Sequence, residues 1–364
     1  MGKVYVVNKT KTLPTMCPST EDIDDGALVP TTGAVANNFC VAVDGSNNSW
    51  TALHCVLTVF CNRKQGKNKS SSVEVVHVAE LDAADLPFDL QPAFVKKETI
   101  NTLNLWHKQK EMMEEASNPE SGVVPATSTS YVEAVRCKSD QSVPGTLAYH
   151  TNEVARPRFL VSGLVGAGGA AEHMGGCSDR PGSIMAHNLW CSRCTSIVVS
   201  PTIEPVINYK HKKYVVAVDG SGRSFHAFQD VCALCNDQHD TIVVVHVMMS
   251  RWKNTMVVKQ AAAAIEKFYL ELLPKLGMPG RVSYQCVQVD CTVENQYYTT
   301  LGESIASFAT QEQATFLALG IDGSGVWNDG TLQWQAKQKP TPGKIVRYLS
   351  LLQNAPCSLI VNCT

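Results

Sequence analysis

The chain contains one short pattern twice: an apolar run that stops at Asp-Gly-Ser and restarts with helical spacing. The two copies are Val41–Ser46 followed by Ser49 and Ala52, and Val216–Ser221 followed by Ser224 and Ala227. Each copy predicts a buried strand that turns directly into a helix. A pattern repeated at this distance indicates a duplicated unit, so we treat the chain as two related halves.

Length and composition allow each half to bury a core. The 364 residues correspond to two domains, since domains run to roughly 150 residues each. Hydrophobic residues make up 44% and charged residues 18%, which is typical of a globular chain. The net charge of −2 predicts no strongly basic surface, which argues against nucleic acid as the main partner.

The chain shows no pattern for a membrane or for secretion. No apolar segment approaches the length of a membrane span, which is about 18 residues, and the N-terminus lacks a signal-peptide pattern. Fourteen cysteines in such a chain favour a reducing compartment over a disulfide framework. We therefore expect a cytoplasmic protein, with a cytoskeleton-associated protein as the alternative.

Composition shifts divide the chain into four segments. They are an extended tail at residues 1–36, a first domain at 37–200 with an insertion at about 81–129, a linker at 201–210, and a second domain at 211–364.

The apolar periodicity predicts alternating strands and helices in both halves. The strands predicted in the first half are Phe39–Val43, Val73–Val78, Tyr131–Cys137, Phe159–Ser162 and Thr195–Ser200. Its helices follow Ser46, cover Val95–Ala116 and Thr146–Ala155, and open at Gly182-Ser183. The strands of the second half are Tyr214–Val218, Thr241–Met248, Val282–Val289, Thr315–Leu319 and Ser358–Val361. Its helices follow Ser221 and cover Lys259–Leu273, Gln296–Ala306 and Lys344–Leu352.

This order of elements predicts the fold class. Right-handed crossovers give each half an α/β fold, with an open five-stranded parallel sheet and helices on both faces. Ligands of such sheets bind at the carboxyl ends of the strands, where the strand order reverses. Asp44 and Asp219 end the first strand of each half. Either carboxylate can accept a ribose hydroxyl or help to hold a metal ion, or it can close a turn with its own backbone. The residues alone leave both interpretations open.

The glycine-rich loop after the fourth strand favours a ligand in the first half. Gly163 and Gly166 would let backbone amides approach a ligand. Gly182 and Ser183 open a helix, whose amide groups and dipole favour a phosphate at that end. The alternative is a purely structural connection.

In these motifs the chain resembles a tandem universal stress protein (UspA-like), over about residues 38–200 and 211–363. The resemblance is carried by the Asp-Gly-Ser turns, by the strand ends Val76–Val78 and Val245–Val247, and by the terminal pieces Cys194–Val199 and Asn354–Val361. It implies two Rossmann-like (adenine nucleotide alpha hydrolase-like) domains.

The resemblance implies a nucleotide site in the first half. It assigns Asp44 to the ribose, the Val78 backbone to adenine, and Gly163, Gly166, Gly182 and Ser183 to the phosphates. The ligand would be ATP or AMP, with Mg²⁺ if ATP is bound. This chain departs from the family spacing, because 15 residues rather than nine separate Gly166 from Gly182. Gly176 has the family spacing, but Cys177 follows it where a hydroxyl residue is expected.

The second half departs further from the family pattern. The equivalent residues are Asp219, Val247, Gly320, Gly323, Gly343 and Lys344. Lys344 replaces the hydroxyl residue, although its ammonium can still reach a phosphate as a point charge. The loop Ser324–Pro342, which carries Trp327 and Trp334, could instead cover the pocket. We therefore expect binding in the first half rather than the second.

Other motifs indicate structure rather than chemistry. The pairs Cys191/Cys194 and Cys232/Cys235 have metal-like spacing but lie on different halves, so we expect no metal site. His77 and His246 occupy equivalent strand ends, which indicates a repeated packing or turn role. No motif positions a water or a base for phosphoryl transfer, so we expect no catalytic residue and at most slow ATP hydrolysis.

Two functions remain open. The first is a nucleotide-binding regulatory or binding module in which ATP or AMP orders the loop before Gly182 and changes the surface that a protein partner contacts. The second is a nucleotide-free structural or interaction protein inside a larger assembly, conceivably cytoskeletal. The resemblance also implies pairing of Ile197–Ser200 with Leu359–Asn362, which would give a pseudo-dimer within one chain or a homodimer.

Overall fold

The fold is an α/β sandwich built on one long sheet. The computed structural model describes residues 37–61, 71–79, 91–116, 128–135, 142–164, 183–200, 211–235, 239–249, 256–289, 297–322, 327–328, 331–332, 343–351 and 356–363. The predicted tail at 1–36 and the linker at 201–210 lie outside these residues.

The strands of the first half match the predicted ones closely. They are β1 (Asn38–Ala42), β2 (Ser72–Ala79), β3 (Ser128–Val135), β4 (Phe159–Gly163) and β5 (Thr195–Val199). The helical segments are α1 (Asn47–Cys55) with its continuation η1 (Val56–Phe60), α2 (Gln91–Ala116), α3 (Val143–Tyr149) with η3 (His150–Ala155), and α4 (Ser183–Cys191).

The second half repeats this order. Its main strands are β6 (Lys213–Ala217), β7 (Thr241–Met249), β8 (Val282–Val289), β9 (Phe316–Gly320) and β12 (Ser358–Asn362). Its helical segments are α5 (Gly222–Leu234), α6 (Met256–Leu272) with η5 (Leu273–Leu276), α7 (Tyr297–Gln311) and α8 (Lys344–Leu351). Several bounds differ from the prediction. Strand β3 and helix α6 each begin three residues earlier than predicted, at Ser128 and Met256, and helix α7 extends to Gln311. The predicted loop after β9 contains a short hairpin of β10 (Trp327–Asn328) and β11 (Thr331–Leu332).

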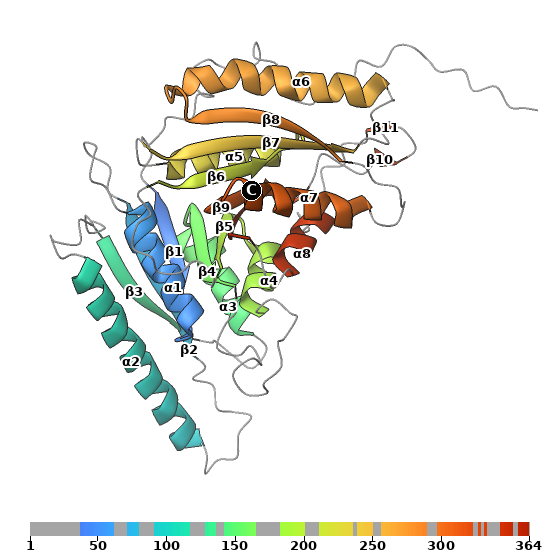
Figure 1. Ribbon diagram of the computed structural model, residues 1–364. Coiled ribbons are helices and arrows are strands. Elements are labelled where there is room, and N and C mark those ends of the chain that lie inside the picture. The colour runs from blue at the N-terminus through green and yellow to red at the C-terminus, as the bar shows by residue number, and fades with distance from the viewer. Residues whose placement is uncertain are drawn as a thin grey trace, which may run out of the picture.

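All ten main strands form a single sheet. Their order is β3-β2-β1-β4-β5-β12-β9-β6-β7-β8, and the sheet is continuous in Figure 1. The strands are parallel within each half, as predicted, and β5 pairs antiparallel with β12 at the centre. The pairing of these two strands, expected from the resemblance, is thus present within one chain. Because the two halves run in opposite directions, their carboxyl ends lie at opposite edges of the sheet.

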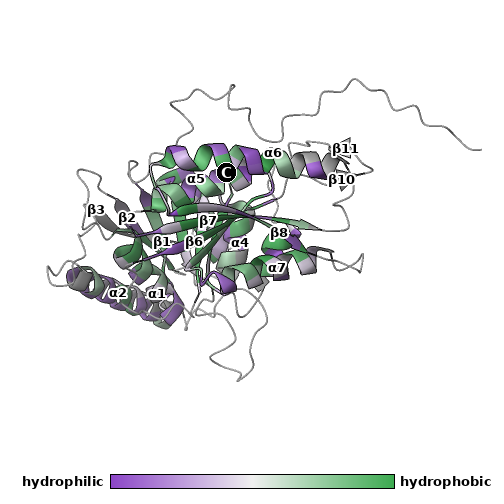
Figure 2. Cartoon of the chain, turned by 45° about the horizontal axis from the view of Figure 1, so that its top comes forward, coloured by the Kyte–Doolittle hydropathy of each residue, from purple (hydrophilic) through white to green (hydrophobic). Residues whose placement is uncertain are grey.

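Helices cover both faces of the sheet. Helices α1, α2, α5 and α6 contribute to one shared core, and α4, α7 and α8 to a second core on the other face. Helix α3 packs on that second face over the first half. In Figure 2 the central strands are largely hydrophobic, while hydrophilic residues gather on outer helices such as α2.

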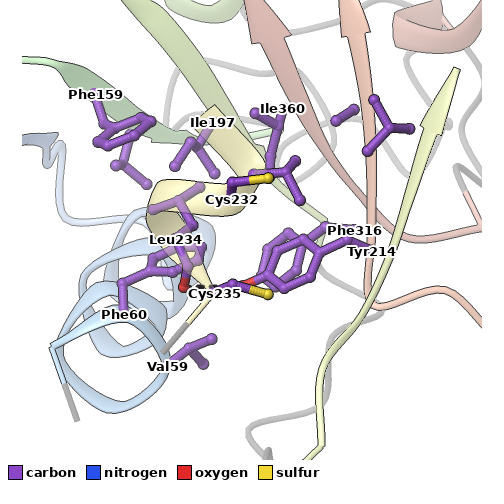
Figure 3. Close-up of a cluster of buried hydrophobic side chains, with 14 of the residues drawn as sticks. Val59, Phe60, Phe159, Ile197, Tyr214, Cys232, Leu234, Cys235, Phe316 and Ile360 are labelled. Atoms are coloured by element: carbon purple, nitrogen blue, oxygen red, sulfur yellow. Dashed lines mark hydrogen bonds between the residues drawn. The ribbon is translucent and has the colours of Figure 1, made fainter. Parts of the chain in front are cut away.

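The shared core crosses from one half to the other. Stacked rings connect Phe159 to Phe39 at 5.3 Å between centroids and Phe39 to Phe60 at 5.7 Å. The contact of Phe60 with Phe316, at 5.2 Å, joins the two halves, and Phe316 stacks on Tyr214. Figure 3 shows the rings of Phe60, Phe159, Phe316 and Tyr214 around Cys232 and Cys235 of α5. The two halves therefore share one hydrophobic core on this face.

Candidate functional site

The candidate site of the first half begins at the turn after β1. The Asp44 carboxylate accepts a hydrogen bond from the Ser46 amide at 3.0 Å, which closes the turn. Gly45 has φ +87°, a conformation that a residue with a side chain rarely adopts. The Ser46 hydroxyl then accepts from the Ser49 amide at 3.2 Å and caps α1. The Asp-Gly-Ser motif therefore encodes both the turn and the helix start.

The second half repeats this geometry. Asp219 accepts from the Ser221 amide at 3.0 Å, Gly220 has φ +82°, and Ser221 caps α5 through the Ser224 amide. The turn-closing role proposed for both aspartates is therefore present in the structure. The turn hydrogen bond does not use the full hydrogen-bonding capacity of the carboxylate, because a carboxylate can accept more than one hydrogen bond.

The sheet places the predicted residues of the first half at one edge. The strand order reverses between β1 and β4, so the carboxyl ends of these two neighbours carry Asp44 and Gly163. Val78 lies near the end of β2, next to β1. Helix α4 begins at Ser183, after the connection that leaves β4. Gly166, Gly182 and the alternative pair Gly176-Cys177 lie outside the described residues.

Gly163 has a packing requirement of its own. A Cβ atom at this position would lie 2.8 Å from backbone atoms of Asn48, at the start of α1. The equivalent Gly320 is equally close, at 2.9 Å, to the backbone of Arg223 at the start of α5. Both glycines therefore allow the first helix of their half to lie against the end of the neighbouring strand.

The second half carries an ion pair at this site, between Arg223 and Asp322, and the first half has no charged residue at the equivalent positions. The Arg223 Nε lies 3.2 Å from Asp322 Oδ1, and both side chains are about three-quarters buried. The equivalent of Arg223 in the first half is Asn48. Sequence reasoning missed this pair, although an arginine two residues after the capping serine is a signal that could have found it.

The amide and ammonium groups predicted to bind phosphate in the second half have partners within the protein. Gly343 donates its amide to the Ile321 carbonyl at 2.7 Å. The Lys344 Nζ lies 4.3 Å from the centroid of the Tyr298 ring, a cation–π contact. Val247 is partly buried near the end of β7, and Gly323 and Trp334 lie outside the described residues. At the carboxyl ends of the strands of the second half, Gly343 and Lys344 thus contact groups of the protein itself.

The two matched histidines differ in their surroundings. His77 is buried, and its Nδ1 lies 3.0 Å from the Val43 carbonyl, which ties β2 to the turn after β1. The Nδ1 of His246 is buried without a hydrogen-bond partner. Burial lowers the pKa of His246, against the opposing effect of Asp219 and Glu266. The predicted turn role therefore describes His77 better than His246.

The cysteine pairs do not form a metal centre within the described residues. No group of three or more metal-ligating side chains occurs there. Cys232 and Cys235 are buried in the shared core, and burial raises the pKa of both thiols. Burial also raises the pKa of Cys194 to about 11, whereas Cys191 is exposed. These buried thiols stay protonated at neutral pH, so they act as small apolar groups.

Comparisons with known proteins bear on the fold alone. No protein-family model matches the chain, and no curated protein is similar to it in sequence. Among solved structures, the chain is similar to a universal stress protein from Archaeoglobus fulgidus, with a TM-score of 0.55 and 14% identity. That match covers 90% of this chain and 98% of the other.

The universal stress protein UspA from Lactobacillus plantarum matches at a TM-score of 0.35 and 13% identity, over 45% of this chain and 98% of the other. The first likeness shows that the chain has the fold of a universal stress protein. In the part of the chain that the structure describes, no helix is long and apolar enough to cross a bilayer.

Proposed function

We propose that the first half of this chain binds an adenine nucleotide and that the protein acts as a regulatory or binding module rather than as an enzyme. One observation carries the proposal. Asp44 and Gly163 end the two neighbouring strands between which the strand order reverses, which is where open α/β sheets bind ligands. The fold shared with a universal stress protein supports the choice of an adenine nucleotide.

The residues of the first half fit such a ligand. Asp44 would accept from the ribose, and the backbone at Val78 would contact adenine. The phosphates would lie toward Gly163, Gly166, Gly182 and Ser183. There the amide groups that open α4 have no partner inside the helix, so they favour an anion. If the nucleotide is ATP, Mg²⁺ would bind through its phosphates and neutralise part of their charge.

The residues of the second half fit a nucleotide poorly. Asp322 is an additional carboxylate at this edge and would repel phosphates, although Arg223 compensates its charge. The Gly343 amide is already used by the Ile321 carbonyl. We therefore propose one nucleotide per chain.

Calorimetric titration of the full chain with ATP and with AMP tests the proposal. We expect saturable heat at one site per chain, and a rise in unfolding temperature at high nucleotide, because a ligand that binds only the folded state stabilises it. No heat and no change in unfolding temperature at millimolar nucleotide would overturn the proposal.

The two turns offer a matched pair of variants. Asp44→Ala and Asp219→Ala each remove the same turn hydrogen bond, at 3.0 Å in both halves. They should therefore destabilise the fold to a similar extent. Only Asp44→Ala should weaken nucleotide binding, by about tenfold or more, because a lost charge-assisted hydrogen bond is worth ~1.5–3 kcal/mol. Equal effects of the two variants on affinity would contradict an assignment to the first half.

A second candidate is a nucleotide-free interaction protein, and helix α2 favours it. Ile100, Leu103 and Trp106 of this helix are exposed at 47%, 52% and 42%. Exposed apolar side chains gathered on one helix are typical of a surface that contacts another protein. Size-exclusion of native extract separates the candidates. Migration in a large complex without nucleotide would favour this second function, and migration at the mass of the chain would favour the first.

A further inference from the structure

The junction between the two halves, which we call the seam, is the antiparallel pair of β5 and β12. Ile197 lies opposite Ile360 at its centre. Ile197 and Ile360 occupy equivalent positions in the two halves. Ile197 lies two residues after Thr195, which pairs with Phe159, and Ile360 lies two residues after Ser358, which pairs with the equivalent Phe316. The pseudo-twofold axis therefore passes between the two isoleucines. An axis of this kind would make the two ends of the seam alike.

The two ends are not alike, because one of them carries a buried charge network. Asp230 of α5 receives two hydrogen bonds from Arg158, from Nη2 at 3.0 Å and from Nε at 3.2 Å. Its other oxygen accepts from the Thr195 hydroxyl and from Asn362 Nδ2, the latter at 3.0 Å. Asp230 is 7% exposed, and Thr195 and Asn362 are each 2% exposed. Arg158 and Thr195 belong to the first half, and Asp230 and Asn362 to the second.

At the opposite end of the seam, the four equivalent positions carry no charged side chain. The residues equivalent to the four members of the network are Thr315, Ser358, Cys55 and Val199. Ser358 accepts a hydrogen bond from the Ser200 amide at 3.0 Å, and Cys55 is buried in the shared core. A thiol thus stands where the charged end has a carboxylate.

This asymmetry distinguishes the native pairing from every pairing of a half with a copy of itself. If two first halves paired, Arg158 would face Cys55 and Val199 and find no carboxylate. If two second halves paired, the buried Asp230 would face Thr315 and Ser358, and the neighbouring lysines Lys212 and Lys213 already pair with Asp240 and Glu312. A buried charge that loses its partner is strongly unfavourable. The four residues are therefore satisfied together only when a first half meets a second half.

We propose that Arg158 and Asp230 make the seam selective, so that β5 pairs with β12 and neither strand accepts the same strand of a second copy. The selectivity is independent of any nucleotide. With β5 and β12 paired at the centre, β3 and β8 are the two outermost strands of the sheet. The partner that the seam fits is the other half of the same molecule.

The test separates selectivity from stability. In the double variant Arg158→Met with Asp230→Leu, apolar side chains replace the charged pair, an exchange that is often neutral or stabilising in other proteins. Thr195 and Asn362 keep their mutual hydrogen bond of 3.1 Å. We expect the double variant to unfold close to the wild-type midpoint, yet to associate with itself as protein concentration rises. Pairing within one chain competes with association between chains, because the tether holds the two halves at an effective concentration of about 1 mM. The wild type and the double variant are therefore compared by sedimentation up to high protein concentration.

The expected result is a wild-type chain that sediments as a monomer of 39.5 kDa at every concentration. The double variant should associate about tenfold or more strongly, which corresponds to ~1.4 kcal/mol of lost discrimination. The single variant Asp230→Asn should in addition raise hydrogen exchange of the β5 and β12 amides relative to those of β7.

The matched control is Glu312→Gln. It removes one charge from the pair with Lys213, which lies wholly within the second half, makes no contact with the network of Asp230 and has an N–O distance of 2.9 Å. This variant should change neither sedimentation nor exchange at the seam. Two results would overturn the proposal: a double variant that stays monomeric at every concentration, or a wild-type chain that sediments as a dimer in which β5 pairs with β5, or β12 with β12, of a second copy.

Discussion

At the scale of single residues, the molecule places the same residue type in different surroundings in its two halves. Asp44 and Asp219 close identical turns, yet only the first lies at an edge without the Arg223–Asp322 ion pair. The duplication therefore preserved the turn chemistry and changed the surroundings. We therefore interpret residues that both halves share, such as Asp44 and Asp219, as requirements of the fold. We interpret residues that differ between the halves, such as Arg223, as candidates for functional differences.

The close approach of Gly163 to α1 gives a prediction at this scale. Gly163→Ala should lower the free energy of unfolding by about 1–3 kcal/mol, because its Cβ would lie 2.8 Å from backbone atoms of Asn48. Denaturant unfolding measures this loss. Gly222→Ala is the control, since nothing lies within 4 Å of a Cβ there. A Gly163→Ala variant as stable as the Gly222→Ala variant would show that the helix is free to move away from the strand.

At the scale of elements, strand and helix positions were predictable, because apolar runs bounded by Asp-Gly-Ser or glycine recur in both halves. Strand β8 was predicted with its observed bounds, Val282–Val289. The β10–β11 hairpin was not, since Trp327–Leu332 shows no strand periodicity. The buried network was not predictable either. The residues of the network around Asp230 lie far apart in sequence. A single aspartate in the apolar pattern of α5 does not indicate which residue it contacts.

Within the candidate site, the Asp-Gly-Ser turns were predictable because their chemistry is local. The ion pair between Arg223 and Asp322 was not, since it depends on how α5 meets the end of β9.

Helix α2 buries two polar side chains that lack a hydrogen-bond partner. Thr102 and Gln109 are buried on its inner side, and their oxygens Oγ1 and Oε1 have no hydrogen-bond partner. A buried hydroxyl without a partner loses its hydration and gains nothing in exchange. The inner side of α6, by contrast, buries the apolar side chains of Ile265 and Phe268 and the ring of Tyr269.

Thr102→Val tests this account of α2. Valine has nearly the same shape and no hydroxyl, so the variant should raise the free energy of unfolding by about 1 kcal/mol. Thr99→Val, an exposed position on the same helix, should give no comparable gain. The comparison is made by denaturant unfolding. Loss of stability in Thr102→Val would contradict the assignment of an unsatisfied hydroxyl.

At the scale of the whole molecule, the antiparallel seam sets the two candidate edges on opposite sides of one ten-stranded sheet. A ligand at the first half would therefore not contact the edge of the second half. What the halves share is the core of stacked rings that connects Phe60 to Phe316. This arrangement predicts a molecule that folds as one unit while binding at one edge.

Cooperative unfolding follows from the shared core. Calorimetry should show one transition rather than two, and Phe60→Ala should lower its midpoint without splitting it, at a cost of about 3–5 kcal/mol. Two transitions, of which only one responds to Phe60→Ala, would mean that the halves fold independently.

Photolabelling with 8-azido-ATP, followed by mapping of the modified peptide, tests the proposed nucleotide site most directly, because the reactive group sits on the adenine ring. The label should appear in the peptide that contains Val78, at one site per chain, and excess ATP should abolish it. Labelling of the peptide that contains Val247 instead, or labelling that ATP does not compete, would contradict a nucleotide site in the first half.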